Sequence, residues 1–388
     1  MKREYDYIIT GGGGSGLITA YRMSRDPWFD DKEVLIIEKE SKDCNDRTWC
    51  YWEEGTGEWD ELLHKKWKKI YFGSPGVNIH AEITPFEYKM LRSKDLYNFL
   101  RTDIRKRKNF HFLVDSVADI RSDNTFAEAI TSGHTFRSQF LLNSIFQFNP
   151  IRNESLYPYL KQHFVGWFIK TENPSFDPDE AVFMDFNIPQ NGNTRFIYVL
   201  PVSESEALVE YTLFSEELLE FHEYEDGIRS YLDAKGIKQY NIIEKESGNI
   251  PMTCFPFHKA NSQRILHIGS AGGWTKASTG FTFSNINKNT KKLIPFLKSS
   301  ADMRLFYQSK KYQYYDRIFI EVLSANNACG TEIFSSLFKS VPVPLILRFL
   351  NDDTTLSQDL RIILRTQPKT DFTMAFFRSL FKQLYHYT

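Results

Sequence analysis

The sequence has little cysteine, and its cysteines form no recognisable set. There are four in 388 residues, at Cys44, Cys50, Cys254 and Cys329. No two of them have the Cys-x-x-Cys spacing and no histidine cluster joins them, so the pattern predicts neither a zinc site nor a disulfide framework. We therefore expect the protein to work in a reducing compartment, the cytoplasm.

Long apolar runs and net charge are also lacking. No stretch reaches the roughly 20 apolar residues of a membrane-spanning helix, so we expect any membrane contact to be peripheral. Residues 5–10 have the pattern of a strand where a secretory signal needs its apolar core, so we expect no signal. The formal net charge of −1 argues against a nucleic-acid partner. Aromatic residues, by contrast, make up 15% of the chain, which is consistent with a long apolar cavity.

A strand, a glycine-rich turn, a helix and a second strand begin the chain. The turn carries Gly11-x-Gly13-x-x-Gly16 directly after the first strand, and Glu38 ends the second strand at residues 34–37. Gly11 permits the tight turn, Gly13 lets the backbone approach a pyrophosphate, and Gly16 lets helix and strand pack closely. Glu38 is placed to accept hydrogen bonds from ribose hydroxyls. The unit therefore predicts a dinucleotide site, although the motif alone does not separate FAD from NAD.

The remainder of the chain favours FAD. Residues 164–212 alternate strand-like runs with turn signals, which indicates an inserted antiparallel sheet. A second glycine cluster follows at residues 269–273, and the pattern beyond Ala277 is mostly helical. This order is typical of flavoproteins in which one FAD spans the domain. In that arrangement Gly269, Ala271 and Gly272 approach the ribityl chain and the flavin.

Seven short motifs carry a more specific resemblance. They are NDRTWCYWE (45–53), QHFVGW (162–167), MDF (184–186), VEYT (209–212), IPMT (250–253), GSAGGWT (269–275) and STGFTF (278–283). Together and in this order they resemble bacterial lycopene beta-cyclases over about the first three-quarters of the chain. The C-terminal part is similar to the family only in its helical character.

The resemblance implies an α/β fold with a Rossmann-type, glutathione-reductase-like FAD-binding domain, an inserted antiparallel-sheet substrate domain and a helical C-terminus. The expected ranges are 1–60, 88–150 and 250–300 for the FAD domain, 61–87 and 151–249 for the substrate domain, and 301–388 for the helical region. It also implies reduced FAD as the cofactor with NAD(P)H as the electron source. The implied substrate is lycopene or a related carotenoid, reached by peripheral contact with the inner face of the membrane.

The implied reaction is an acid-initiated cyclisation without net redox change. The ends of lycopene close to β-ionone rings, through γ-carotene to β-carotene. Glu210 occupies the position of the family's proposed acid, and burial in an apolar strand raises a carboxyl pKa as such a role requires. His163, Asp185 and Glu53 are expected near it, and Arg47 and Arg92 are expected to contact FAD. Flavin or a protein side chain takes the final proton; the sequence leaves both open.

Two alternatives stay open on the same fold. One is an FAD-dependent monooxygenase or reductase acting on an isoprenoid or other apolar substrate, and the other is a non-catalytic carrier of FAD or lipid. Against oxygen chemistry, residues 142–145 lack the Asp-Gly of aromatic hydroxylases, and Ser270 stands where many flavin monooxygenases carry Asp. For the membrane contact, residues 376–385 have the spacing of an interfacial amphipathic helix, and residues 334–350 are a second candidate.

Overall fold

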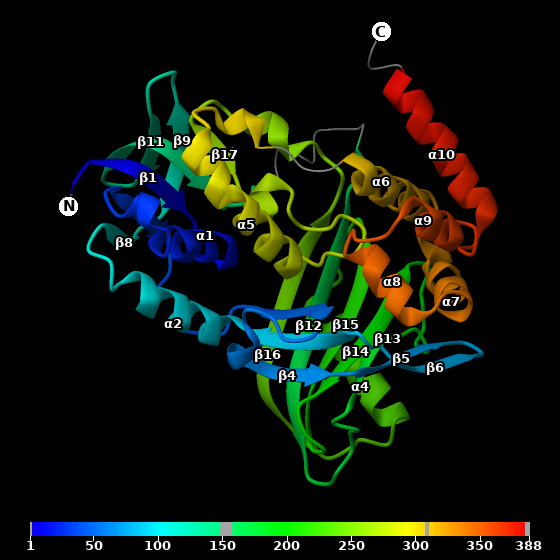
Figure 1. The fold of residues 1–388 in the computed structure, drawn as a ribbon. Coiled ribbons are helices and arrows are strands. Elements are labelled where there is room, and N and C mark those ends of the chain that lie inside the picture. Colours follow the sequence, from blue (N-terminus) through cyan, green and yellow to red (C-terminus); the bar gives the residue numbers. More distant parts are fainter. Residues whose placement is uncertain (1, 148–156, 307–309, 385–388) are drawn as a thin grey trace.

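Three sheets and a helical C-terminal region build the molecule (Figure 1). The computed structural model describes residues 2–147, 157–306 and 310–384. The predicted domain boundary between residues 150 and 151 therefore lies outside the described residues, as does Tyr385 of the expected interfacial helix.

The first sheet has seven strands and a parallel centre. Its strands are β8 (Phe110–Val114), β2 (Val34–Glu38), β1 (Glu4–Thr10), β11 (Thr135–Asn143), β10 (Ala127–Thr131), β9 (Val117–Ser122) and β17 (Ile265–His267). Parallel pairing joins β8 to β2, β2 to β1, β1 to β11 and β11 to β17, whereas β9 and β10 are antiparallel additions. Parallel strands that are buried on both faces consist of continuous apolar residues, and β2 has such a sequence.

Helices cover one face of this sheet. They are α1 (Gly14–Ser24), α2 (Ser93–Ile104) and α5 (Phe283–Ser299). Their buried side chains share one core with the inward residues of β1 and β2. Ser93 is the first residue of α2, and its hydroxyl accepts hydrogen bonds from the backbone N–H groups of Asp46 and Arg47.

The second sheet also has seven strands and is almost wholly antiparallel. In spatial order they are β16 (Tyr240–Met252), β12 (Leu160–Thr171), β15 (Glu206–Ser215), β14 (Thr194–Pro201), β13 (Glu180–Asp185), β5 (Lys69–Ser74) and β6 (Val77–Glu82). One face packs on α4 (Phe221–Ala234), and the opposite face packs on the third sheet and the C-terminal helices. The two faces of each central strand therefore meet different environments, which decides below which side chains reach the site.

The third sheet is small and joins the other two. It consists of β3 (Thr48–Glu54), β7 (Phe86–Arg92) and β4 (Leu63–Trp67). Within the expected range 61–87, β5 and β6 extend the second sheet, whereas β4 pairs with β7 in the third sheet. Trp52, Trp67 and Tyr88 of this small sheet pack into the same core as Phe183 and Leu208 of the second sheet.

The C-terminal region is helical. It comprises α6 (Lys310–Ala325), α7 (Gly330–Ser340), α8 (Val343–Leu350), α9 (Leu356–Ile363) and α10 (Lys369–Leu384). Short 3-10 turns lie at η1 (Pro27–Phe29), η2 (Asp60–Leu62), η3 (Phe257–Ala260), η4 (Gly269–Gly272), η5 (Met303–Leu305) and η6 (Asn327–Cys329). Over the described ranges, none of the helices combines the length and the hydropathy needed to cross a bilayer. Together the sheets and helices confirm the predicted Rossmann-type fold with an inserted antiparallel sheet and a helical C-terminus.

Candidate active site

One cavity of about 730 Å³ extends from the glycine turn after β1 to the inner face of the second sheet. At the first end it is lined by Gly11, Gly13, Gly14, Ser15, Glu38, Lys42, Asp46 and Arg47. At the second end it is lined by Cys50, Tyr88, Phe164, Tyr198, Leu200, Leu208, Glu210, Glu246 and Phe281. The dinucleotide motif and the predicted acid therefore open onto the same space, although residues 16 and 210 are far apart in the chain.

The glycine turn has the geometry that a pyrophosphate requires. Gly11 has φ +93°, a backbone conformation that residues with a side chain rarely adopt. A Cβ on Gly16 would lie only 2.0 Å from the carbonyl oxygen of Gly11. Gly13 precedes α1 with no side-chain cap, and a Cβ there would meet nothing within 4 Å. The free N–H groups and the positive end of α1 thus face the cavity, which is a ready site for an anion.

Two further side chains complete this end of the cavity. Glu38 ends β2, and one of its carboxylate oxygens accepts a hydrogen bond of 2.6 Å from the N–H of Gly12. Arg47 is exposed and lines the cavity, and its guanidinium donates to the carbonyl of Asp46. Deeper in the cavity, Oε1 of Gln162 is buried with no hydrogen-bond partner among the described residues. Residues Gly11, Gly13, Glu38 and Arg47 fit a bound dinucleotide, and Gln162 offers it a further polar contact.

The second glycine cluster reaches the cavity at one residue only. Gly269 has φ +60° and packs on α1, where a Cβ would lie 2.2 Å from Oγ of Ser15. A Cβ on Gly272 would lie 2.1 Å from the carbonyl oxygen of His267. The contact of Gly269, Ala271 and Gly272 with the cofactor stays a prediction. Gly269 and Gly272 allow close packing at this turn, and Ser270 is the residue of the cluster that lines the cavity.

Arg92 is not among the residues that line the cavity. Its guanidinium pairs with Glu244 at 2.5 Å and lies 4.3 Å from the ring centre of Phe168. The expected contact between Arg92 and FAD stays a prediction, and it would have to compete with this ion pair to Glu244 on β16. The sequence carried no sign of this pairing, since Glu244 lies in a different sheet.

Glu210 reaches the cavity from β15 and is only 9% exposed. The hydroxyl of Thr212 donates a hydrogen bond of 2.5 Å to its Oε1. Burial, reinforced by the negative charge of Glu246, raises the pKa of Glu210 to about 8, and the Thr212 bond opposes that rise. The carboxyl of Glu210 is therefore held as a neutral acid near neutral pH.

Glu246 is a second carboxyl in the cavity that the sequence analysis missed. It lies on β16 and accepts a hydrogen bond of 2.6 Å from the hydroxyl of Thr48. Removal from bulk water raises its pKa to about 7, while the Thr48 bond and the charge of Arg92 act in the opposite direction. In the sequence Glu246 is one of several alternating charged residues, a pattern typical of a solvated strand, so no local signal identified it.

Apolar and aromatic groups enclose these two acids. Tyr88, Tyr198, Phe164 and Phe281 line this end of the cavity together with Leu208. Burial keeps the pKa values of the Tyr88 and Tyr198 phenols well above their usual range, so both rings stay neutral. Aromatic faces such as these can stabilise a cation.

The three residues expected beside Glu210 lie elsewhere. His163 and Asp185 are on the α4 side of the second sheet, because successive side chains of a strand point to opposite faces. His163 bonds with the hydroxyls of Tyr224 and Ser215 at 2.5 and 2.7 Å, and Tyr231 donates to Asp185 at 3.0 Å.

Glu53 is also turned away from Glu210. It accepts a hydrogen bond of 3.1 Å from the buried ammonium group of Lys89, and it is not among the residues that line the cavity. The predictions for His163, Asp185 and Glu53 as neighbours of the acid are therefore wrong. The carboxyl group that does neighbour it is Glu246.

Solved structures share this fold over nearly the whole chain. A geranylgeranyl bacteriochlorophyll reductase-like protein from Thermoplasma acidophilum is 14% identical with a TM-score of 0.59, over 94% of this chain and 97% of its own. A p-nitrophenol 4-monooxygenase from Pseudomonas putida is 14% identical with a TM-score of 0.58, over 98% and 99%. A flavin-dependent brominase variant is 14% identical with a TM-score of 0.58, over 92% and 97%. At this identity the similarity establishes the fold, which is that of a group of enzymes that includes flavin-dependent members.

The family follows from the sequence itself. The model of the lycopene cyclase protein family matches residues 6–379. The chain therefore belongs to the lycopene cyclase family, as its motifs indicated.

Proposed function

We propose that the chain is a lycopene beta-cyclase that binds FAD and closes the linear ends of lycopene to β-ionone rings. The observation that carries the proposal is that Glu210, a carboxyl held neutral by burial, opens onto the same aromatic-lined cavity as the dinucleotide turn. Membership of the lycopene cyclase family supports the substrate class.

In the proposed reaction Glu210 acts as the acid. Its O–H bond breaks as a C–H bond forms on the terminal double bond of the substrate, which leaves a carbocation. The neighbouring double bond attacks this cation and closes the ring, and loss of a proton gives the ring alkene. One proton enters and one leaves, so the product is an isomer of the substrate and no electrons are exchanged.

The residues of the cavity support each stage. Thr212 fixes one oxygen of Glu210 by donating to Oε1, which leaves Oε2 to carry the proton. The rings of Tyr88, Tyr198 and Phe281 stabilise the positive charge and exclude water that would trap the cation. Gly11, Gly13, Glu38 and Arg47 would hold FAD, which in its reduced, anionic form, with NAD(P)H as the electron source, supplies negative charge beside the cation.

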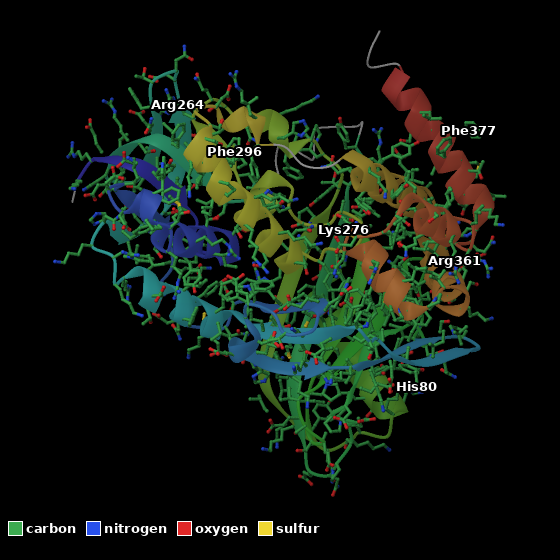
Figure 2. The ribbon with its side chains drawn as sticks, in the orientation of Figure 1. His80, Arg264, Lys276, Phe296, Arg361 and Phe377 are labelled. Atoms are coloured by element: carbon green, nitrogen blue, oxygen red, sulfur yellow. The ribbon has the colours of Figure 1, made fainter. Side chains whose placement is uncertain are left out.

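We also propose that the enzyme takes its substrate from a membrane surface through α9 and α10. Large apolar side chains are exposed on these helices and the residue that follows α9: Leu356, Leu360, Ile363, Leu364, Met374, Phe376, Phe377 and Leu380. Exposed basic residues accompany them: Arg361, Arg365, Lys369 and Arg378. Figure 2 shows Arg361 and Phe377 on the outer side of the C-terminal region, away from the three sheets. Apolar groups with basic neighbours suit an anionic lipid surface.

The alternative membrane segment at residues 334–350 is largely core. Ile346 and Leu347 are fully buried, and Phe334 and Phe349 pack against the same cluster. The proposed lipid contact therefore rests on α9 and α10 and not on α7 and α8. We place it at the cytoplasmic face of the membrane.

The direct test is expression of the chain in cells that accumulate lycopene, followed by chromatography of the pigments. We expect β-carotene from the native chain and unchanged lycopene from Glu210→Gln. Glu206→Gln is the matched control, since Glu206 lies on the same strand in a surface ion pair with Lys170. Unchanged lycopene with a folded, flavin-loaded native protein would refute the cyclase.

A flavin-dependent redox enzyme is the second candidate, because the similar structures include a monooxygenase and a reductase-like protein. The two functions differ in stoichiometry. The cyclase forms product anaerobically with catalytic amounts of NAD(P)H, whereas a reductase or monooxygenase consumes one NAD(P)H for each product formed.

A further inference from the structure

Glu210 and Glu246 occupy one row of the second sheet. Gly166 on β12 pairs with Glu210 on β15 and with Glu246 on β16, so the three residues lie side by side across adjacent strands. Strands in a sheet lie about 4.8 Å apart, and side chains in one row point to the same face. Both carboxyls therefore enter the cavity from the same face of the sheet, on the two sides of Gly166.

The missing side chain at Gly166 leaves room for its neighbours on both sides of the row. A Cβ at Gly166 would lie 2.9 Å from Cδ1 of Leu208, 3.2 Å from Cγ of Glu246 and 3.5 Å from Cβ of Glu210. The side chains of Leu208, Glu246 and Glu210 therefore share the space above the glycine. A larger residue at position 166 would have to displace them.

The surroundings of the two acids differ. Glu246 accepts a hydrogen bond from the hydroxyl of Thr48. The positive charges of Arg92 and Arg47 lower its pKa, and the negative charge of Glu244 raises it. Glu210 accepts a hydrogen bond from the hydroxyl of Thr212. The side chains of Cys50, Tyr88 and Tyr198 lie near it, and burial keeps these three groups uncharged. Burial raises the pKa of both carboxyls, but hydrogen bonding and nearby positive charge oppose that rise more at Glu246, so Glu246 is the member of the pair that ionises more readily.

We propose that Glu246 is the base of this site: it accepts the proton that leaves the ring carbon beside the cation and returns it to Glu210. The inference rests on the proposed cyclisation. The C–H bond of the ring carbon breaks, its electrons form the ring double bond, and the proton bonds to an oxygen of Glu246. Transfer of that proton to the Glu210 carboxylate restores the starting state, with no net change in protons or electrons.

The kinetic test compares Glu246→Gln with the native holoenzyme, using reduced FAD and lycopene in vesicles. Glutamine keeps the shape and cannot accept the proton, so we expect kcat to fall about 100-fold or more with KM and flavin content unchanged. The activity that remains should lose the acidic limb of its pH profile, and Glu246→Asp should restore part of the rate. Glu206→Gln should behave as the native enzyme does. A native rate and pH profile in Glu246→Gln would overturn the proposal.

A second measurement does not depend on turnover. Infrared titration of the holoprotein follows the protonated carboxyl of Glu210, assigned by its loss in Glu210→Gln. We expect Glu246→Gln to move the ionisation of Glu210 to lower pH, because a neighbouring negative charge is removed. Gly166→Ala should also change it by displacing the two side chains. An unchanged titration in both variants would refute the pair, whereas a coupled titration in a protein that does not convert lycopene would refute the cyclase and leave the pair standing.

Discussion

The hydroxyl of Thr212 donates a hydrogen bond of 2.5 Å to Oε1 of Glu210, two positions earlier on β15. The two residues point to the same face of the sheet because side chains alternate along a strand. The bond stabilises the ionised form of Glu210, so it opposes the effect of burial on the pKa of that carboxyl.

Removal of this bond should weaken the acid. In Thr212→Val we expect the pKa of Glu210 to rise further, so the alkaline limb of the pH–rate profile moves to higher pH. The maximal rate should fall roughly tenfold, in line with a lost hydrogen bond to a charged group. Thr212→Ser keeps the hydroxyl and should retain the native profile. A valine variant with the native alkaline limb would contradict the assignment of Glu210 as the acid.

The raised pKa of Glu210 should also be visible in stability. The folded chain holds this proton up to about pH 8, whereas the unfolded chain releases it near the ordinary value of 4.5. Between these values the folded state binds more protons, so the free energy of unfolding of the native chain falls as pH rises.

Glu210→Gln removes the ionisable group and with it this decrease in the free energy of unfolding at higher pH. The variant should therefore be more stable than the native chain at pH 8 by roughly 3–5 kcal/mol, and close to it at pH 4.5. Thermal unfolding at several pH values measures the difference. Glu206→Gln should show no such growth with pH, and a constant difference for Glu210→Gln would show that Glu210 ionises normally.

The glycine turn gives a matched pair of alanine substitutions. A Cβ meets nothing within 4 Å at either Gly13 or Gly133, so both variants should fold with native melting temperatures. Gly13 lines the cavity, and a methyl group there occupies the space of the pyrophosphate. Gly13→Ala should lose most of its flavin on gel filtration, whereas Gly133→Ala should keep it. Equal flavin content in the two would exclude this turn as the cofactor site.

The lipid contact of α9 and α10 makes a separate prediction. Leu360 and Phe377 are 59% and 53% exposed, so a double change to Glu should leave the fold intact. Binding to phosphatidylglycerol vesicles in a flotation assay should fall at least tenfold, because two apolar groups are lost and two negative charges are gained. Ile243 and Leu218, which are 60% and 51% exposed on other elements, provide the matched double control. An equal loss in the control would show that the binding is not specific to these helices.

The sequence alone determined the nucleotide end of the site. Gly11, Gly13 and Gly16 are close in the chain, and their roles follow from backbone geometry that needs no distant partner. The order of motifs predicted the fold and the family. The resemblance to that family identified Glu210, and its place in an apolar strand, which is unusual for a carboxylate, agreed with that role.

Only the tertiary structure decided which side chains surround that acid. The register of β12 with β15 and β16 brings Glu246 into the row of Glu210, and the pleat sends His163 and Asp185 to the opposite face. Arg92 pairs with Glu244, a residue of another sheet. Strand register, and therefore the face to which each side chain points, is set by pairing between strands that are distant in the sequence. For that reason the sequence predicted Glu210 but not its neighbour Glu246.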